Sequence, residues 1–315
     1  MSRKPMLATD AVESKLHFPL GLQPKIDGVR SLYLEDRMTG RSLKGHRNKH
    51  ATEFFSLEPF FGFDGEMAAE HECHPDLCRL TSSALSTIEG KPWIMWHLFD
   101  YVTPATVGMP YRLRYAALKE YVANMQIAHP ELAVHVRIMP MYVVTTLEEL
   151  RRHHDALVIA GYEGSIIRDL DGPYKDGRST VNEGWLLRNK DFVEEDAIVE
   201  SVIEGETNGN DAQTNALGYI ERSTHQENMI PNGMVGAMMC RLKTDVKFQG
   251  KKMFDKGQLI KVSAGRMTHD QRKHFFEHQD KLIGETIKFK FFPKGILDKP
   301  RFPTFQSLRS ASDVV

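Results

Sequence analysis

Lys25-Ile26-Asp27-Gly28-Val29-Arg30 sets a lysine two residues ahead of an Asp-Gly pair and an arginine two residues behind it. Gly28 tolerates the backbone conformations of a tight turn, and Asp-Gly pairs are common in such turns. Hydrophobic and polar residues alternate from Val29 to Leu34, which predicts a strand after the turn. Lys25 is therefore expected at the end of a strand, although the tetrapeptide alone is more typical of a surface turn.

A lysine is a nucleophile only when its amine is neutral, so a reactive lysine needs cationic neighbours or a metal ion to lower its pKa. Arg30 and Arg41 follow Lys25 closely in the sequence. We expect these arginines, with a bound divalent cation, to favour the neutral amine. Asp27 is expected to hold the amine in line for attack.

Length and composition indicate a globular protein of two domains. The chain has 315 residues, and no apolar run approaches the roughly 20 residues of a membrane span. The basic start, Met1–Pro5, lacks an apolar signal segment behind it. Cys73, Cys78 and Cys240 cannot all pair within the chain, which is typical of a reducing compartment. A soluble, cytoplasmic protein is therefore expected, with no membrane partner.

Residues 71–78 hold His71, Cys73, His74 and Cys78, a spacing that suggests zinc. Zinc sites with this kind of spacing usually have a second ligand pair farther along the chain. The sequence has no such pair at a zinc-finger spacing. A structural zinc ion is therefore not the favoured interpretation.

The distribution of charge is more informative than the net charge of −1. Residues 241–309 contain 17 Lys and Arg against 7 Asp and Glu, a net charge of +10, which leaves −11 for the rest of the chain. A basic module beside an acidic remainder is expected where one part of a protein binds phosphates. A lysine-rich solvated face would give the same distribution.

The pattern of elements predicts an α+β domain over residues 1–193 and a strand-rich domain over 194–315. In the first, strands are expected over 60–67, 93–101, 164–168 and 184–190, and helices over 111–125 and 147–160. In the second, strands are expected over 197–203, 234–242, 259–262 and 286–291, with a helix over 268–283. Residues 207–233 are rich in Asn, Gly, Thr and Gln and are expected to be mostly loop. This second pattern is compatible with an all-β barrel of the OB type.

Candidate functional residues follow one another in a distinctive order. They are Lys25-Ile26-Asp27-Gly28, Arg41, Asp64-Gly65-Glu66, Phe99-Asp100-Tyr101, Glu163-Gly164, Arg188-Asn189-Lys190 and Arg301-Phe302-Pro303-Thr304-Phe305, with Arg309 beyond. Each motif is weak alone, but the ordered series resembles the motif set of the ATP-dependent DNA ligases, within the covalent nucleotidyltransferase superfamily. It is most similar to small ligases of the bacteriophage type. The resemblance implies an adenylation (nucleotidyltransferase) domain followed by an OB-type DNA-binding domain.

For the nucleotide, the resemblance implies that Lys25 attacks the α-phosphate of ATP and becomes linked to AMP. Gln23 would contact the adenine edge, and Phe99 would stack on the adenine face, a role that suits an aromatic ring. Arg30 and Arg41 would bind ATP or the phosphate at a nick in DNA.

For the metal and phosphate, the resemblance implies Mg²⁺ or Mn²⁺ held by Glu66, Glu163 and Asp27, with Glu66 also near the ribose. Lys190 would contact the α-phosphate and offset its charge during attack. The family usually has lysine where this chain has Arg188. Arginine keeps the charge but is planar and two-pronged, so its contact has a different geometry.

For DNA, the resemblance implies that a monomer binds nicked duplex. Arg301 would orient the leaving pyrophosphate, and Arg41 would contact DNA. The sequence-independent phosphate contacts are assigned to basic residues of the second domain: Lys247, Lys251, Lys252, Lys256, Lys261, Arg266, Lys288 and Lys290. If the chain comes from a phage, its compartment would be the host-cell cytoplasm.

Other functions remain open from the sequence. An RNA ligase or an mRNA-capping guanylyltransferase belongs to the same superfamily, although the Arg-Phe-Pro-Thr-Phe ending favours a DNA ligase. An NAD-dependent ligase would have a much longer chain. A non-catalytic OB-type protein that binds single strands would not need Lys25 at all.

Overall fold

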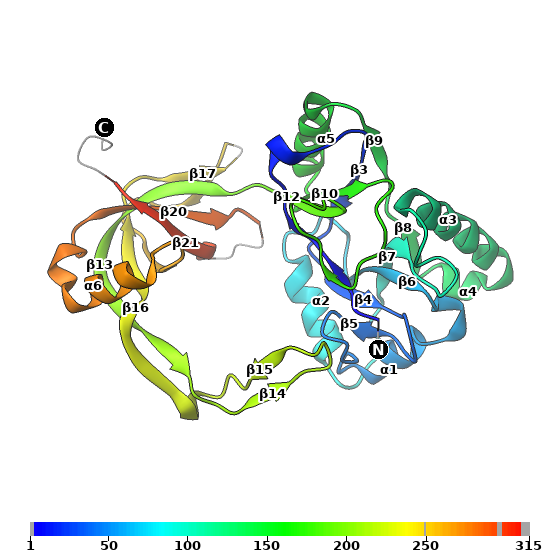
Figure 1. Cartoon of the computed structure of the whole chain (residues 1–315), viewed down its shortest axis with the longest axis horizontal. Helices are drawn as coiled ribbons and strands as arrows, with labels where there is room; N and C mark the ends of the chain where they lie inside the picture. Colours follow the sequence, from blue (N-terminus) through cyan, green and yellow to red (C-terminus); the bar gives the residue numbers. More distant parts are fainter. Residues whose placement is uncertain (1–2, 249, 295–297, 310–315) are drawn as a thin grey trace. The chain divides into compact units, whose positions relative to one another are not determined.

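The structure is a computed structural model that describes residues 3–248, 250–294 and 298–309. The chain divides into two compact units, with the division between Lys190 and Asp191 (Figure 1). Each unit has a hydrophobic core of its own. Each can therefore be stabilised by its own buried apolar side chains.

One sheet of the first unit contains the strand that follows the Asp-Gly turn. Its strand order is β5 (Thr39–Gly40), β4 (Val29–Leu32), β6 (Phe63–Ala68), β7 (Met95–Tyr101) and β8 (Val136–Ile138). The helices of this region are α1 (Lys49–Phe54), η2 (Glu58–Phe60), α2 (Leu77–Ser86), α3 (Tyr111–Ala128) and α4 (Pro130–Ala133). Phe60, Phe63, Trp96 and Tyr111 are fully buried in its core. The predicted strands over 60–67 and 93–101 and the helix over 111–125 are confirmed to within three residues.

The other large sheet carries Lys25. Its strand order is β2 (Thr9–Asp10), β12 (Leu186–Lys190), β10 (Gly164–Asp169), β3 (Leu20–Lys25) and β9 (Tyr142–Val144). Helix α5 (Leu147–Ile159) packs its buried Leu150 and Leu157 with Leu22 of β3 and Ile167 of β10. The predicted strands over 164–168 and 184–190 and the helix over 147–160 are confirmed. Lys25 is the last residue of β3, as predicted.

Helix α5 begins at Thr146, whose side chain accepts a hydrogen bond from the Glu149 amide. The Glu149 carboxylate accepts from the Thr145 amide at 2.7 Å. A capping box between Thr146 and Glu149 is therefore only half formed, because the carboxylate bonds one residue earlier than a box requires. Helix α6 (His269–Glu277) has the complete box, between Thr268 and Gln271.

Two very short strands complete the first unit. Strand β1 (Met6–Leu7) runs parallel to β11 (Gly177–Arg178), and η1 (Glu13–Lys15) follows β2. The chain thus passes residues 6–10 beside β11 and then beside β12 before it enters β3.

The second unit is a closed barrel with the strand order β13-β16-β19-β21-β20. These strands are β13 (Val193–Asn208), β16 (Met229–Leu242), β19 (Leu259–Ser263), β20 (Thr286–Phe292) and β21 (Arg301–Leu308), with a hairpin of β17 (Val246–Phe248) and β18 (Lys251–Phe254). In β20, Ile287, Phe289 and Phe291 are fully buried, while Lys288 and Lys290 alternate with them. This is the alternation that the sequence predicts for a strand with one buried face.

Two predictions for the second unit are wrong in detail. Residues 207–233 are not mostly loop: β13 and β16 continue to pair up to Asn208 and Met229, and β14 (Ala212–Thr214) and β15 (Ile220–Arg222) form a hairpin beyond them. Backbone hydrogen bonds hold such a ladder without apolar alternation, so its side chains give no strand signal. The helix expected over 268–283 ends at Glu277 and is followed by η4 (Gln279–Lys281); η3 (Gln226–Asn228) precedes β16.

The described part of the chain contains neither a disulfide nor a helix that could span a membrane. Cys73, Cys78 and Cys240 form no disulfide. Of the helices in the described part of the chain, none is long and apolar enough to cross a membrane. Near the suggested zinc residues, the rings of His71 and His74 instead accept hydrogen bonds from the Cys73 and Asp76 amides.

Candidate active site

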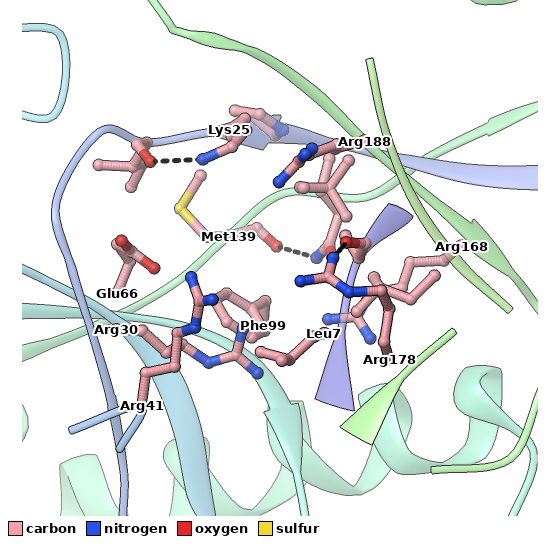
Figure 2. Close-up of a pocket in the computed structure, with 16 residues that line it drawn as sticks. Leu7, Lys25, Arg30, Arg41, Glu66, Phe99, Met139, Arg168, Arg178 and Arg188 are labelled. Carbon is pink, nitrogen blue, oxygen red and sulfur yellow. Dashed lines mark hydrogen bonds between the residues drawn. The ribbon is translucent and has the colours of Figure 1, made fainter. Parts of the chain in front are cut away.

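A pocket in the first unit collects seven of the residues that the sequence predicts for the site (Figure 2). They come from both large sheets and from the loop after β5: Gln23, Lys25, Arg30, Arg41, Glu66, Phe99 and Arg188. Residues 7–8, 166, 168, 178 and 186 also line it. Motifs that are far apart in the sequence thus lie together around one pocket.

The turn after Lys25 fits against β6 so closely that only glycine is possible there. A Cβ atom on Gly28 would lie 2.3 Å from the Met67 carbonyl oxygen and 2.9 Å from Cγ of Glu66. Real Cβ atoms do not approach a backbone oxygen so closely. Gly28 therefore brings the Lys25 strand end and the Glu66 strand together.

Lys25 is held by the carboxylate of Glu163. Its Nζ lies 2.6 Å from Glu163 Oε2, and Lys190 Nζ donates to Glu163 Oε1. The three residues meet because Lys25 is opposite Gly164 across β3 and β10, and Gly164 is opposite Lys190 across β10 and β12. The Glu163 amide also donates to the Lys25 carbonyl oxygen at 2.9 Å.

The charges around Lys25 raise its pKa. Burial disfavours the charged amine, but the carboxylates of Glu163 and Glu66, with a smaller contribution from Asp27, outweigh burial. The expectation that Arg30 and Arg41, with a bound divalent cation, favour the neutral amine stays a prediction. The groups that act on the amine are carboxylates, which favour an ammonium ion.

The neighbours of Lys25 have shifted pKa values as well. Burial and the positive charge of Lys25 lower the pKa of Lys190. For Glu163, burial favours the neutral acid, but Lys25 and Lys190 outweigh it and lower the pKa. Burial raises the pKa of Glu66 to about 7, against the opposing effects of Lys25 and Arg30. Such a cluster of shifted groups in a pocket is typical of a reactive site.

Arg30 is fixed by a two-pronged ion pair. Its Nε and Nη2 donate to the two carboxylate oxygens of Asp64 at 2.6 and 2.8 Å. Tyr174 donates to the same carboxylate at 3.1 Å. Asp64 is fully buried, and the three donated hydrogen bonds satisfy its carboxylate oxygens.

Phe99 lies among guanidinium groups. The Cζ atom of Arg30 is 4.5 Å from the centroid of the Phe99 ring, and that of Arg168 is 5.3 Å away. Arg168 is 2% exposed and pairs with Asp100 at 3.4 Å, while Asp100 is held by Arg114 at 2.8 Å. The Phe99 ring is thus part of the pocket wall, and the guanidinium groups of Arg30 and Arg168 lie next to it.

Gln23 lies deep in the pocket and is 1% exposed. The Tyr111 hydroxyl lies 2.9 Å from its Oε1 and 2.8 Å from the Phe99 carbonyl oxygen. The Gln23 amide nitrogen is 3.5 Å from the Met139 carbonyl oxygen. Both polar atoms of the amide thus have a protein partner, and because an amide has two N–H donors and two acceptor lone pairs, it retains hydrogen-bonding capacity for a ligand.

Arg178 and Arg168 also line the pocket, although neither residue is predicted from the sequence to belong to the site. Arg168 ends the predicted strand that follows Glu163, and Arg178 lies in the Gly/Asp/Lys-rich loop between two predicted strands. The feature of the sequence that points to these two arginines is a basic residue next to a strand that carries site residues. It is weak, because such loops are basic in many proteins.

The carboxylates near Lys25 suit a cation that arrives with phosphate. Glu66, Glu163 and Asp27 all act electrostatically on Lys25. In residues 3–248, 250–294 and 298–309, no three His, Cys, Asp or Glu side chains are grouped so that they could hold a metal ion alone. Mg²⁺ usually takes one or two carboxylates together with substrate phosphates and water. The residues present fit that pattern.

The remaining predicted residues belong to the second unit. Arg301 begins β21, with its guanidinium 5.4 Å from the ring centroid of Phe302. The predicted DNA contacts on β17, β18, β19 and the segments after them are exposed: Lys247, Lys251, Lys252, Lys256, Lys261 and Arg266. Lys252 is paired with Asp245 and Asp255. On β20, Lys288 is paired with Glu194, and Lys290 lies 4.2 Å from the ring centroid of Phe192.

Comparison with known proteins identifies structural relatives, although neither a family model nor a curated protein matches the sequence. The DNA ligase-adenylate of Chlorella virus is 27% identical over 97% of this chain and 99% of its own, with a TM-score of 0.51. A second structure of that ligase-adenylate gives 26% identity over 98% of both chains and a TM-score of 0.53. A Lig E DNA ligase shares the fold at 18% identity, with a TM-score of 0.69 over 98% of this chain.

These neighbours cover both units of the chain, and they share the family that the ordered motifs predict. The predicted resemblance is therefore confirmed in three dimensions: over nearly its whole length, this chain is similar to a DNA ligase-adenylate.

Proposed function

We propose that this chain is an ATP-dependent DNA ligase that joins a 5′-phosphate to a 3′-hydroxyl at nicks in duplex DNA. One observation carries the proposal. Lys25 ends a strand in a pocket with Phe99, Glu66 and several arginines, and the chain around this pocket is similar along its length to a DNA ligase-adenylate.

In the first step, Nζ of Lys25 attacks the α-phosphorus of ATP. The new N–P bond forms as the P–O bond to pyrophosphate breaks, and the amine loses its proton. Glu163 Oε2, 2.6 Å from Nζ, is placed to hold that proton. Lys190 keeps Glu163 oriented and brings positive charge next to the reacting phosphate.

Other side chains of the pocket bind the nucleotide. Phe99 stacks on the adenine, and Gln23 contacts its edge from the base of the pocket. Arg188 accompanies Lys190 at the α-phosphate. A bound Mg²⁺ or Mn²⁺, held by one or two of the carboxylates of Glu66, Glu163 and Asp27 together with the phosphates, would supply further positive charge there.

In the second and third steps, AMP moves from Lys25 to the 5′-phosphate of the nick, and the 3′-hydroxyl then displaces AMP. Arg30 and Arg41, both at the pocket, are suited to bind that phosphate. Holding both strand ends at one site supplies much of the rate, because the reaction becomes effectively intramolecular.

Residues 1–193 form the adenylation domain in this proposal, and residues 194–315 form an OB-type domain that binds DNA. The exposed basic residues of the barrel contact phosphates without reading sequence, so affinity should fall steeply with salt. The protein acts as a monomer on nicked duplex.

The decisive experiment uses ATP labelled at the α-phosphate. The protein is first stripped with pyrophosphate, then incubated with magnesium and labelled ATP, and denatured. Wild type should retain the label covalently, whereas Lys25→Ala should retain none. Label on both proteins, or on neither, would contradict Lys25 as the nucleophile.

A chase then identifies the substrate. Labelled wild-type protein mixed with nicked duplex DNA should release AMP and give joined DNA. Transfer to nicked RNA but not to DNA would instead indicate an RNA ligase. Transfer to a 5′-diphosphate RNA end would indicate a capping enzyme. Covalent labelling of the protein excludes a purely non-catalytic binding role.

A further inference from the structure

Three of the arginines that line the pocket are bonded to one short segment. Arg30 Nη2 donates to the Met6 carbonyl oxygen at 3.3 Å, and Arg178 Nη1 donates to the Ala8 carbonyl oxygen. Arg188 Nε donates to the Asp10 carboxylate at 2.5 Å. We call residues 6–10 the N-terminal strap. It contacts three pocket arginines that are far from it in the sequence.

The bonded positions in the strap are every second residue. In an extended chain the carbonyl groups of alternate residues point to the same side, as those of Met6 and Ala8 do here, whereas Asp10 makes its contact through its side chain. Leu7 and Ala8 themselves line the pocket, and Figure 2 draws Leu7 among the lining side chains, with Arg178 and Phe99 also in the wall. The strap is therefore part of the pocket wall.

The strap is itself firmly anchored. Met6 is 1% exposed, and its amide donates to the Tyr174 hydroxyl at 3.1 Å. Tyr174 in turn donates to Asp64, the carboxylate that holds Arg30. The strap also pairs with β11 at Met6 and Leu7 and with β12 at Thr9 and Asp10. Because both ends are fixed, it can define where the guanidinium groups point.

Each arginine uses only part of its donor set on the strap. A guanidinium has five N–H donors in a rigid planar fork. Arg178 and Arg188 each donate to the strap from one nitrogen, so further N–H groups of these two forks remain to face the pocket. Arg30 also donates from Nε and Nη2 to Asp64, which leaves its Nη1 to face the pocket. A fork held by one nitrogen is oriented for two-pronged binding of phosphate.

We propose that the N-terminal strap is a positioning element that orients Arg30, Arg178 and Arg188 for phosphate groups in the pocket. The inference rests on the proposed ligase function. The phosphate belongs to ATP or to the 5′ end at a nick, and the two sources share the same chemistry. On this view Asp10 and Tyr174 are positioning residues that act through the arginines.

Asp10 is the residue of the strap best suited to a test. It bonds Arg188 through its side chain and not its backbone, so a substitution removes the contact. Asp10→Ala removes the acceptor, and Asp10→Asn keeps an oxygen acceptor without the charge. The matched control is Glu13→Ala: Glu13 is bonded to Arg151 at 2.5 and 3.0 Å, but neither residue lines the pocket. All four proteins are compared in melting temperature, lysyl-AMP formation and sealing of nicks that already carry AMP.

We expect Asp10→Ala to lower the rate of at least one of the two steps about tenfold or more, since small misplacements of a binding group are costly. Loss confined to lysyl-AMP formation would assign the strap to the phosphates of ATP. Loss confined to sealing would assign it to the nick phosphate. Asp10→Asn should stay within about threefold of wild type because orientation, not charge, is at stake.

The inference is overturned if Asp10→Ala equals or exceeds wild type in both steps, or if Glu13→Ala loses as much. An Asp10→Asn variant as impaired as Asp10→Ala would also contradict it. Tyr174→Phe, which removes the hydroxyl between Met6 and Asp64, should raise the KM for ATP while lysyl-AMP still forms. A wild-type protein that forms no lysyl-AMP would instead refute the proposed function itself.

Discussion

The Glu163 carboxylate has two opposing effects on Lys25 as a nucleophile. Its carboxylate holds the amine in place at 2.6 Å, and it also raises the pKa of that amine. A charged amine cannot attack phosphorus, so the proton must pass to another group when the nucleotide is bound. Lys190, on the other oxygen of Glu163, helps to lower the pKa of that carboxylate and places a second positive charge at the site.

Lys190→Ala should therefore cripple lysyl-AMP formation and leave the fold intact. Removing the ammonium takes away charge stabilisation at the α-phosphate, which typically costs a factor of about 10² to 10³ in rate. Labelled-ATP incorporation and circular dichroism measure the two effects. Lys175→Ala is the matched control, since Lys175 contacts Glu183 at 2.6 and 2.8 Å away from the pocket. Normal lysyl-AMP formation by a folded Lys190→Ala protein would remove Lys190 from the site.

His46 gives a prediction for stability against pH. Burial lowers the pKa of His46 to about 4, while its ring bonds the Ser31 hydroxyl at 2.8 Å. Below about pH 6.5 the unfolded chain binds a proton at this histidine that the folded chain refuses. The free energy of unfolding should therefore fall as pH is lowered from about 6.5 towards 4, by up to about 1.4 kcal/mol per pH unit from this group.

Urea unfolding of wild type and His46→Gln at several pH values between 7 and 4 measures this contribution. The variant lacks the titrating ring, so its stability should decline less steeply over that range. Identical slopes in the two proteins would show that His46 does not titrate with a lowered pKa.

At the scale of elements, the site depends on how closely the turn after β3 approaches β6. Lys25 ends β3, Glu66 lies on β6, and the turn between β3 and β4 passes directly over Met67. Register across β3, β10 and β12 then brings Glu163 and Lys190 to the same place. The catalytic geometry is thus set mainly by backbone pairing.

Gly28→Ala should consequently damage both stability and activity. The added methyl group would lie 2.3 Å from the Met67 carbonyl oxygen, so β6 or the turn must move. Overpacking of this kind costs about 1–3 kcal/mol, and the shift would separate Lys25 from Glu66. Chemical denaturation and lysyl-AMP formation report the two losses. Gly108→Ala, with nothing within 4 Å of the added atom, should leave both unchanged; equal behaviour of the two variants would refute the close-approach argument.

The elements show why part of the fold could be predicted from the sequence. Strands such as β20 alternate buried and outward residues, and helices such as α5 have an apolar stripe, so their periods reveal them. The paired extension of β13 and β16 has no regular alternation: it mixes polar residues with Met229 and Ile230, and it has no fully buried side, so the sequence predicts loop there. Backbone pairing alone leaves no side-chain pattern to detect.

At the scale of the whole molecule, the order of motifs was more informative than any single motif. Residues from Gln23 to Arg188 converge on one pocket because the strands that carry them are neighbours in two sheets. Sequence could not reveal that carboxylates would raise the pKa of Lys25, because the balance of charges depends on distances. Nor could it single out the strap, whose contacts are with residues more than 20 positions away and partly through backbone oxygens.

Arg301 belongs to the second unit, and the proposed function assigns it to the first reaction step. It begins β21 in the barrel, and the Arg-x-Pro-x-Phe pattern implies that it orients the leaving pyrophosphate. Pyrophosphate leaves only in the first step, so Arg301→Ala should slow lysyl-AMP formation much more than sealing of nicks that already carry AMP. The expected difference is at least about tenfold, since a positively charged group is lost from a developing anion. Arg241→Ala controls for surface charge in the same unit, because Arg241 is exposed and paired with Glu200 at 2.9 Å. Equal losses in both steps would show that Arg301 supports the barrel or DNA binding in general, and would contradict its assignment to pyrophosphate.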